Sequence, residues 1–351
     1  MKIIHLLYSD KFSGAENVAC QIIGMFSGDE NIEMVYCSSD GPVKDVLAEK
    51  GVRYIPLKKF TVKEIRRVIR EEKADVVYAH DMRASFYAYR ACGKLPFISH
   101  IHNNAFDSRG LSLKSIAYYF AARKARHIFW VSKSAFNGYF FHNRFKNKSS
   151  VLYNVIDVDG LLEKMKTDEN VYDYDVVYVG RLTFAKDPPR LMRVIKLLAE
   201  KMPSVKVAVV GTGELEEETK KLAREYGIEN NVDFLGFTLN PYKILHDGKV
   251  MVMTSKFEGT PMCALEAMAL GVPIVSTPTD GLKDLVDDGV TGFLSDKDEE
   301  LVARIHEVIE NAEQRKILSE NSSKKARVIN DREHYKNEIL RVLPENDESG
   351  K

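Results

Sequence analysis

The chain has 351 residues, of which 44% are hydrophobic and 29% charged, as is typical of a soluble globular protein. This length exceeds what one hydrophobic core normally serves and favours two domains. No apolar run approaches the ~18 residues of a membrane-spanning helix. The short apolar start ends at Asp10, so we interpret it as a strand and not as a secretion signal. The four scattered cysteines lack metal-ligand spacing and favour a reduced, cytoplasmic protein.

Charge is distributed unevenly along the chain, although the net charge is zero. Residues 1–155 carry 24 Lys and Arg against 14 Asp and Glu, whereas the remainder carries 27 against 37. Residues 83–148 hold 12 basic residues and one acid, together with 15 of the 34 aromatic residues. This basic, aromatic-rich segment indicates an anionic partner for the first half of the chain.

Short apolar runs alternate with amphipathic helical stretches along the whole chain. Strands are predicted at 2–8, 32–39, 53–57, 74–80, 96–102, 127–132 and 150–154, and then at 174–180, 205–211, 232–237, 249–255 and 272–277. The polar stretch 158–173 is interpreted as a linker, and the chain from about 297 as helical. Apolar strands separated by helices predict an α/β protein with two doubly wound parallel sheets, in two domains that face a cleft.

One predicted helix follows the strand at 249–255. Thr260 suits its N-cap, Pro261 suits its first position, and Gly271 suits the stop after a helix over 262–270. The amino end of a helix presents unpaired N–H groups and roughly half a positive charge. Such an end is a binding site for a diphosphate.

Two glutamates with seven residues between them flank the start of this helix. Glu258 precedes it and Glu266 lies one to two turns inside, so the pair can flank an elongated ligand. Carboxylates accept hydrogen bonds from hydroxyls, so each suits a sugar ring, with phosphates between them at the helix end. The alternative is one capping glutamate and one exposed glutamate on an amphipathic helix.

The loops after other predicted strands supply cations and glycines. Arg181 and Lys186 lie in a loop that opens a helix, where two cations suit the oxygens of a diphosphate, although a solvated pair is the alternative. Gly213 lets the backbone approach a ligand, but a single Gly-x-Gly is a weak signal. Gly236 and Phe237 end another strand, where a base could pack. A buried core position is the commoner fate of a lone phenylalanine.

Five blocks of sequence in the second half resemble those of the retaining glycosyltransferases of family 4, which have the two-domain GT-B fold. The blocks are VGRL, VGTGE, FLGF, FEGTPMCALEAMALGVPIVST and DGVTGFL, in that order. The likeness runs over almost the whole chain. It implies an acceptor-binding domain at 1–157, completed by a C-terminal helix at about 328–345, and a nucleotide-sugar-binding domain at 174–327.

The resemblance also implies roles for individual residues of the second half. Arg181 and Lys186 are expected on the diphosphate. Glu266 is expected on the ribose, and Glu258 on the donor sugar. Further donor contacts are expected from Gly213, Gly236, Phe237, Gly259, Thr260, Pro261 and Met262. Because the family requires no metal ion, neither a metal nor another cofactor is expected.

In the first half, the resemblance singles out two strand ends. Ser13 and Gly14 begin a helix after the first strand and are expected near the donor phosphate, with Ser13 where the family usually has glycine. His100 and His102 share one face of a strand. His102 matches the family's cleft histidine, whose implied role is to hold the donor sugar and polarise the reacting centre. His80 also ends a strand and is the weaker candidate.

The basic segment 83–148 admits two interpretations. Apolar residues recur in it at helical spacing among basic ones, namely Leu113, Ile116, Tyr119 and Phe120. They can form a surface that meets anionic headgroups and a lipid-linked acceptor, placing a cytoplasmic protein on the inner face of the membrane. They can equally form a buried face opposite a solvated basic one. Nucleic acid is a poor candidate partner, because no known binding module is present.

Together these features predict a hexosyltransferase that moves a sugar, with retention, from a nucleoside-diphosphate donor to an acceptor hydroxyl. UDP is expected as the nucleotide, and a lipid-linked or cell-envelope saccharide as the acceptor. Two alternatives stay open. One is a nucleotide-sugar epimerase of similar fold, and the other is a catalytically silent protein that binds nucleotide sugars.

Overall fold

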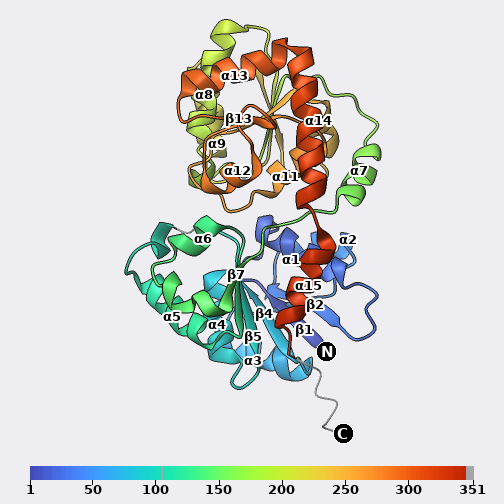
Figure 1. The fold of residues 1–351 in the computed structure, drawn as a ribbon, viewed down its shortest axis with the longest axis vertical. Helices are drawn as coiled ribbons and strands as arrows, with labels where there is room; N and C mark the ends of the chain where they lie inside the picture. Colours follow the sequence, from blue (N-terminus) through green and yellow to red (C-terminus); the bar gives the residue numbers. More distant parts are fainter. Residues whose placement is uncertain (104–105, 345–351) are drawn as a thin grey trace. The chain divides into compact units, whose positions relative to one another are not determined.

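The computed structural model describes residues 1–103 and 106–344 and divides the chain into two compact units (Figure 1). The first unit comprises Met1–Asn154 and the segment that begins at Arg332, and the second comprises Val155–Asp331. Residues 104–105 of the basic segment, and residue 345 of the predicted terminal helix, lie outside the described residues.

A parallel sheet forms the centre of the first unit, with strand order β3-β2-β1-β4-β5-β6-β7. Its central strands are buried on both sides, which is why their sequences are apolar without alternation. The strands are β1 Lys2–Leu6, β2 Glu33–Ser39, β3 Tyr54–Leu57, β4 Val76–His80, β5 Phe97–Ile101, β6 His127–Trp130 and β7 Ser149–Val151.

Helices cover both faces of this sheet. One face packs against α3 Val62–Glu71, α4 Asp81–Ala91, α5 Leu113–Lys124 and α6 Lys133–Gly138. The other packs against α1 Gly14–Met25 and α2 Val43–Glu49. Two 3₁₀ segments, η1 Phe106–Ser108 and η2 His142–Lys148, lie in the connections.

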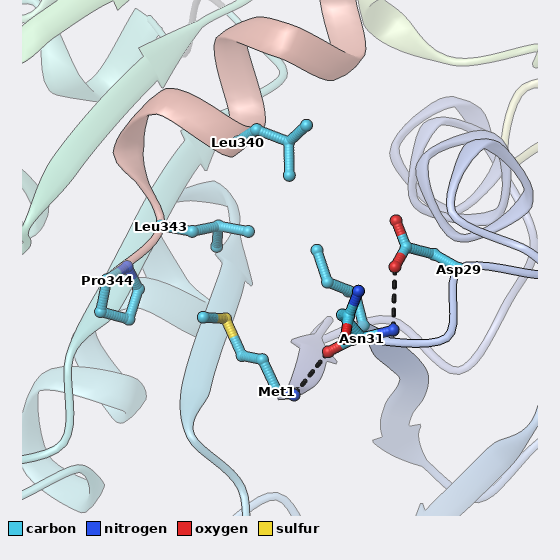
Figure 2. Close-up of a pocket in the computed structure, with 7 residues that line it drawn as sticks. Met1, Asp29, Asn31, Leu340, Leu343 and Pro344 are labelled. Carbon is cyan, nitrogen blue, oxygen red and sulfur yellow. Dashed lines mark hydrogen bonds between the residues drawn. The ribbon is translucent and has the colours of Figure 1, made fainter. Parts of the chain in front are cut away.

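The C-terminal helix α15, Arg332–Val342, belongs to this first unit although 177 residues of the second unit precede it. Its end is held by the Arg126 guanidinium, whose Nε donates to the Val342 carbonyl at 2.8 Å. Figure 2 shows the pocket where this end meets the start of the chain, with Leu340 and Leu343 beside Met1. The chain's amino group donates to the Asn31 carbonyl there.

The second unit has its own parallel sheet, with strand order β10-β9-β8-β11-β12-β13. The strands are β8 Val176–Val179, β9 Val207–Val210, β10 Val232–Gly236, β11 Val250–Met253, β12 Ile274–Ser276 and β13 Gly292–Leu294. One face packs against α8 Pro188–Lys201, α9 Glu216–Glu225 and α13 Asp298–Glu310. The other packs against α7 Val158–Lys166, α10 Tyr242–Asp247, α11 Met262–Ala269, α12 Asp280–Leu285 and α14 Ala312–Ile329.

The predicted α/β class with two doubly wound parallel sheets is confirmed, but the linker predicted over 158–173 is wrong in its first half. Residues Val158–Lys166 form α7, which the Asp157 side chain caps by accepting from the Gly160 N–H. Leu161 is buried in the core of the second unit. One apolar stripe on an otherwise polar helix is enough to dock it, and that stripe is hard to see in so polar a sequence.

Candidate active site

The predicted site residues lie at the carboxyl ends of strands, and several of them lie where the strand order reverses. In the second unit, β8 and β11 are neighbours although two strands separate them in sequence, and the loops after them carry Lys186 and Glu258. In the first unit β1 and β4 are the corresponding neighbours; Gly14 follows β1, and His80 is the last residue of β4. Open parallel sheets bind ligands at such switch points.

In the second unit, Lys186 and Glu258 form a buried ion pair. Lys186 Nζ donates to Glu258 Oε1 at 2.5 Å, and Ser255 Oγ donates to the same oxygen at 2.6 Å. The two charged side chains are 16% and 7% exposed. Burial lowers the pKa of Lys186, but the charge of Glu258 and its hydrogen bond more than offset this, so the pKa lies above its usual value. Lys186 is therefore a fixed cation.

Backbone hydrogen bonds tie together the two loops that carry this pair. The Lys256 N–H donates to the Ala185 carbonyl at 2.9 Å, and the Thr254 hydroxyl donates to the Asp187 carbonyl at 3.2 Å. Asp187 takes a left-handed conformation with φ 51°. Its Oδ1 forms an ion pair with Lys256 Nζ at 3.2 Å. The tight turn at Asp187 thus presents Lys186 to the glutamate loop.

The helix after this loop begins at Met262, as predicted, but its N-cap lies one residue later than predicted. Pro261, with ψ 121°, is the N-cap of α11 and has no capping side-chain bond, and Met262 is the first helical residue. Thr260 is therefore not the N-cap but a buried residue of the preceding loop. A proline N-cap is compatible with this start because its missing N–H is outside the helical bonding pattern.

A close backbone contact fixes the loop at Gly259. A Cβ placed on Gly281, in the first turn of α12, would overlap the carbonyl oxygen of Gly259. Glycine at 281 therefore lets α12 lie directly against the loop that carries Glu258. This residue was not singled out from the sequence, because nothing in TPTDG indicates which loop it contacts.

The second glutamate, Glu266, lies close enough to act on the same thiol as Glu258 and Lys186. Burial raises the pKa of the Cys263 thiol to about 12, and the charge of Lys186 opposes that rise while Glu258 and Glu266 add to it. Cys263 therefore lies within the fields of all three charges. Glu266 is only 8% exposed, which excludes the alternative of an exposed surface glutamate. Burial, and next the charge of Glu266, raise the pKa of Tyr242.

Arg181 joins this cluster from the loop after β8. Its side chain is exposed, and its positive charge acts to lower the pKa of Lys186. The Tyr178 hydroxyl donates to its carbonyl at 3.0 Å. The structure thus groups the four predicted charges of the second unit, namely Arg181, Lys186, Glu258 and Glu266, around the start of α11.

The predicted glycines serve the packing of neighbouring loops. A Cβ on Gly213 would overlap the carbonyl of Leu182, so this glycine lets the loops after β8 and β9 touch. Gly236, with φ 70°, ends β10 at an irregular register, and its carbonyl accepts from Gly211 at 2.7 Å. Phe237 follows it and is 57% exposed, so its interpretation as a core residue is wrong. Its ring is available to a ligand.

In the first unit, four histidines gather across β1, β4 and the end of β5. His80 lies between two partners, with His5 at 2.9 Å and His102 at 2.7 Å. His100 contacts the Tyr78 hydroxyl at 3.1 Å. Burial lowers the pKa of His5 and of His102 to about 3 and moves those of the other two well below their usual range. The rings are therefore neutral at pH 7.

A metal ion can be bound by His, Cys, Asp or Glu side chains. Among the described residues, one group of three such side chains has its possible metal-binding atoms within 4.8 Å of one another, namely His80, His100 and His102. Sequence reasoning found these three but missed His5, which lies inside a strand 75 residues from His80 and gives no local signal.

At the start of α1, Ser13 is the N-cap, and its hydroxyl donates to the buried Glu16 carboxylate at 2.5 Å. Gly14, the first helical residue, has open space where a Cβ would stand. The serine that replaces the family's glycine is thus held against its own helix.

The apolar stripe of α5 faces outward. Leu113 is 89% exposed, and Ile116 and Phe120 are exposed as well, because α5 packs inward through another face, which carries Tyr118, Ala121 and Ala122. The interpretation of the stripe as a buried face is therefore wrong for these three exposed residues, whereas Tyr119 is partly buried against the core. No helix in the described part of the chain is long and apolar enough to cross a membrane.

Comparison with known proteins gives matches to two family models. Residues 17–159 match the model described as Glycosyltransferase Family 4, and residues 162–325 match Glycosyl transferases group 1. Over 237 residues the chain is 30% identical to an uncharacterized glycosyltransferase of Methanocaldococcus jannaschii, covering 61% of this chain and 58% of that protein. The aligned part thus spans less than two thirds of that relative.

Two further likenesses are informative. Over 154 residues, 44% of this chain and 41% of the relative, the chain is 31% identical to the N-acetylgalactosamine-N,N'-diacetylbacillosaminyl-diphospho-undecaprenol 4-alpha-N-acetylgalactosaminyltransferase of Campylobacter jejuni. Anabaena HepE, solved in complex with UDP-glucose, shares the fold with a TM-score of 0.83 at 23% identity, over 98% of this chain and 100% of HepE. The chain therefore belongs to the group 1 and family 4 glycosyltransferases, with the GT-B fold that its sequence predicts.

Proposed function

We propose that the protein transfers a sugar from UDP to an acceptor hydroxyl with retention of configuration and without a metal ion. The second unit holds the donor, and the first holds the acceptor and contributes His102, Ser13 and Gly14. The observation that carries this proposal is the buried Lys186–Glu258 pair, which lies beside the start of α11 at the sheet's switch point. The UDP-glucose complex of HepE, a protein of the same fold, supports the choice of UDP.

Donor binding changes the partner of Lys186. Cleavage of the sugar–phosphate bond develops negative charge on the diphosphate, and fixed cations stabilise that charge most effectively where water is excluded. Lys186, Arg181 and the first N–H groups of α11 supply positive charge. As the diphosphate takes over the ammonium of Lys186, Glu258 is released to accept hydrogen bonds from the sugar hydroxyls.

Glu266 and Phe237 complete the donor site in this proposal. Glu266 lies inside α11 and binds the ribose hydroxyls, while the exposed ring of Phe237 packs against the base. The backbones of Gly213, Gly236, Gly259, Thr260, Pro261 and Met262 line the space between them. For retention, the acceptor oxygen attacks from the face that the diphosphate leaves. The acceptor's proton passes to the departing phosphate oxygen, so no protein base is consumed.

The acceptor is proposed to be a lipid-linked or cell-envelope saccharide. The name of the Campylobacter jejuni relative includes a diphospho-undecaprenol acceptor. The exposed stripe of Leu113, Ile116 and Phe120 lies in the segment with 12 basic residues against one acid. Exposed apolar side chains with surrounding cations are the features that bind an anionic membrane surface, so the proposed location is the inner face of the membrane.

A panel of nucleotide sugars scored by thermal shift tests the donor assignment. A donor at 100 times its dissociation constant stabilises its protein by ~2.7 kcal/mol, which gives a readable rise in melting temperature. UDP-sugars are expected to give it and other nucleotides are not. Product analysis with the best donor should then show the retained anomer and unchanged turnover in excess EDTA. Inversion, or loss of activity in EDTA, would overturn the scheme, and conversion of the sugar without acceptor would indicate an epimerase.

A further inference from the structure

Three histidines of the first unit form a continuous hydrogen-bonded chain with a defined end. His5 Nδ1 lies 2.9 Å from His80 Nε2, and His80 Nδ1 lies 2.7 Å from His102 Nε2. At the far end, His5 Nε2 lies 3.2 Å from the thioether sulfur of Met34. His5 and His80 are almost completely buried, so water does not interrupt the chain.

The thioether gives this chain a direction. A neutral imidazole has one N–H and one lone pair, and a thioether sulfur can only accept. His5 therefore donates from Nε2 to Met34, which leaves its Nδ1 as an acceptor for the Nε2–H of His80. The Nδ1 of His80 is then an acceptor in turn, and it takes the Nε2–H of His102.

The opposite direction is poorer. It would set the lone pair of His5 against the sulfur of Met34 and would place an N–H on Nδ1 of His102. That Nδ1 is buried and has no hydrogen-bond partner among the described residues. A buried N–H without an acceptor is costly, whereas in the first direction all three N–H groups are bonded and only a lone pair is left.

The segment that carries His102 is also fixed in place. The Asp81 carboxylate accepts a hydrogen bond from the His102 backbone N–H at 2.9 Å. Asp81 takes a left-handed conformation with φ 67°, which is rare for a residue with a side chain. Such strain persists where the surrounding structure enforces it. Here the hydrogen bond of Asp81 links the end of β4, at His80, to the residue that follows β5.

We propose that His5 and His80 are positioning residues that hold His102 as its Nε2–H tautomer, with the lone pair on the buried Nδ1, so that the ring which the proposed function places at the donor sugar keeps one orientation. This inference rests on the proposed function for the identity of the ligand, but the tautomer itself does not depend on it. The proposal explains why a buried chain of hydrogen-bonded histidines runs from the sheet interior, at His5, to the end of a strand, at His102.

A metal ion is the competing explanation for these rings, since His80, His100 and His102 have ligand atoms close together. The distances favour the hydrogen-bonded chain. Two nitrogens bound to one tetrahedral zinc at about 2.0 Å stand roughly 3.3 Å apart, whereas His80 and His102 are 2.7 Å apart. Metal analysis of the purified protein separates the two explanations.

The first experiment records two-bond proton–nitrogen correlations of the intact protein labelled with ¹⁵N-histidine, at pH 7.5. His102 is expected as the Nε2–H tautomer, and the signals of its ring should shift when the donor identified by the panel is added. An Nδ1–H tautomer, or one equivalent of zinc in the protein, would overturn the proposal. So would unchanged ring signals of His102 with saturating donor. If no donor binds at all, the proposed function fails while the tautomer result still stands.

The second experiment breaks the chain at a distance from the ligand. In His5→Phe, which keeps a ring against Tyr78, the His80 Nε2–H loses its acceptor, so the Nδ1–H form of His102 should become populated. Turnover should fall about tenfold with little change in KM, and Met34→Leu should give a smaller effect in the same direction. His127→Phe, a partly buried histidine of β6 outside the chain, is the control. Equal losses in all three variants, or an unchanged His102 tautomer in His5→Phe, would overturn the proposal.

Discussion

At the scale of single residues, the reaction depends most on Lys186. Lys186→Ala should lower turnover by ~10²-fold or more, as when a preorganised charge-stabilising donor is removed. It should also destabilise the second unit by about 3–5 kcal/mol, because Glu258 is left as a buried charge without its cation.

A double variant separates these two effects. Lys186→Met combined with Glu258→Gln removes both charges and should recover most of the stability in urea unfolding, but none of the turnover. Lys256→Ala, which removes the neighbouring cation that pairs with Asp187, should keep near-normal activity. Normal turnover in Lys186→Ala would contradict the assignment.

Gly14 offers a test of ligand approach that leaves the fold intact. A Cβ at this position meets no atom within 4 Å, so Gly14→Ala should fold normally and yet raise the KM for the donor several-fold by crowding its phosphate. Gly24→Ala is the matched control, since Gly24 lies in the same helix with equally open space. It should stabilise the protein by up to about 1 kcal/mol without changing KM. Identical kinetics in the two variants would place the donor elsewhere.

At the scale of secondary-structure elements, the exposed stripe of α5 is the feature to test. Leu113→Asp combined with Phe120→Asp should weaken flotation with vesicles that contain anionic lipid, because both apolar contact and charge attraction are reduced. Ile317→Asp, at a 53% exposed position on α14, is the control. Equal binding by wild type and both variants would assign the stripe another role.

The elements also show what the sequence can predict. Every predicted strand is present, because most strands of these parallel sheets are short apolar runs rich in valine and isoleucine that alternate with longer amphipathic helices. β13 was missed as a strand since its three residues begin with glycine and give little strand signal, and α7 was missed because most of its residues are polar. Local pattern is weakest where an element docks through a few side chains.

Site geometry was less predictable than site membership. The sequence identified Lys186 and Glu258 separately, but not that they pair, since they are 72 residues apart and only the neighbouring of β8 and β11 brings them together. The same limit hid His5. The exposure of Phe237 could not be predicted either. A single aromatic residue at a strand end belongs to no periodic pattern that would show whether its side chain is buried.

At the scale of the whole molecule, acid should act on the first unit before the second. His5 and His102 have pKa values of about 3 when folded, against about 6.5 when unfolded, so the unfolded state binds more protons as pH falls through 6.5. Between pH 7.5 and 5.5 each such histidine should reduce the free energy of unfolding by about 1.4 kcal/mol.

Native-state hydrogen exchange at the two pH values measures this difference, after correction for intrinsic exchange rates. Amides of β4 and β5 should lose protection, whereas those of β8 and β11 should not, because the buried polar residues described in the second unit include no histidine. Equal loss in both units, or none in the first, would show that the buried rings do not control acid stability.

The position of Cys263 has a practical consequence. It is only partly buried, whereas the other three cysteines are fully buried, and its thiol lies in the fields of Lys186, Glu258 and Glu266. Because alkylation requires the thiolate, the resting protein should label slowly there. Any ligand that draws Lys186 from its glutamate also redistributes the charge around this sulfur. The unmodified chain thus carries a chemical reporter next to its ion pair, and labelling kinetics can follow occupancy without an assay for the product.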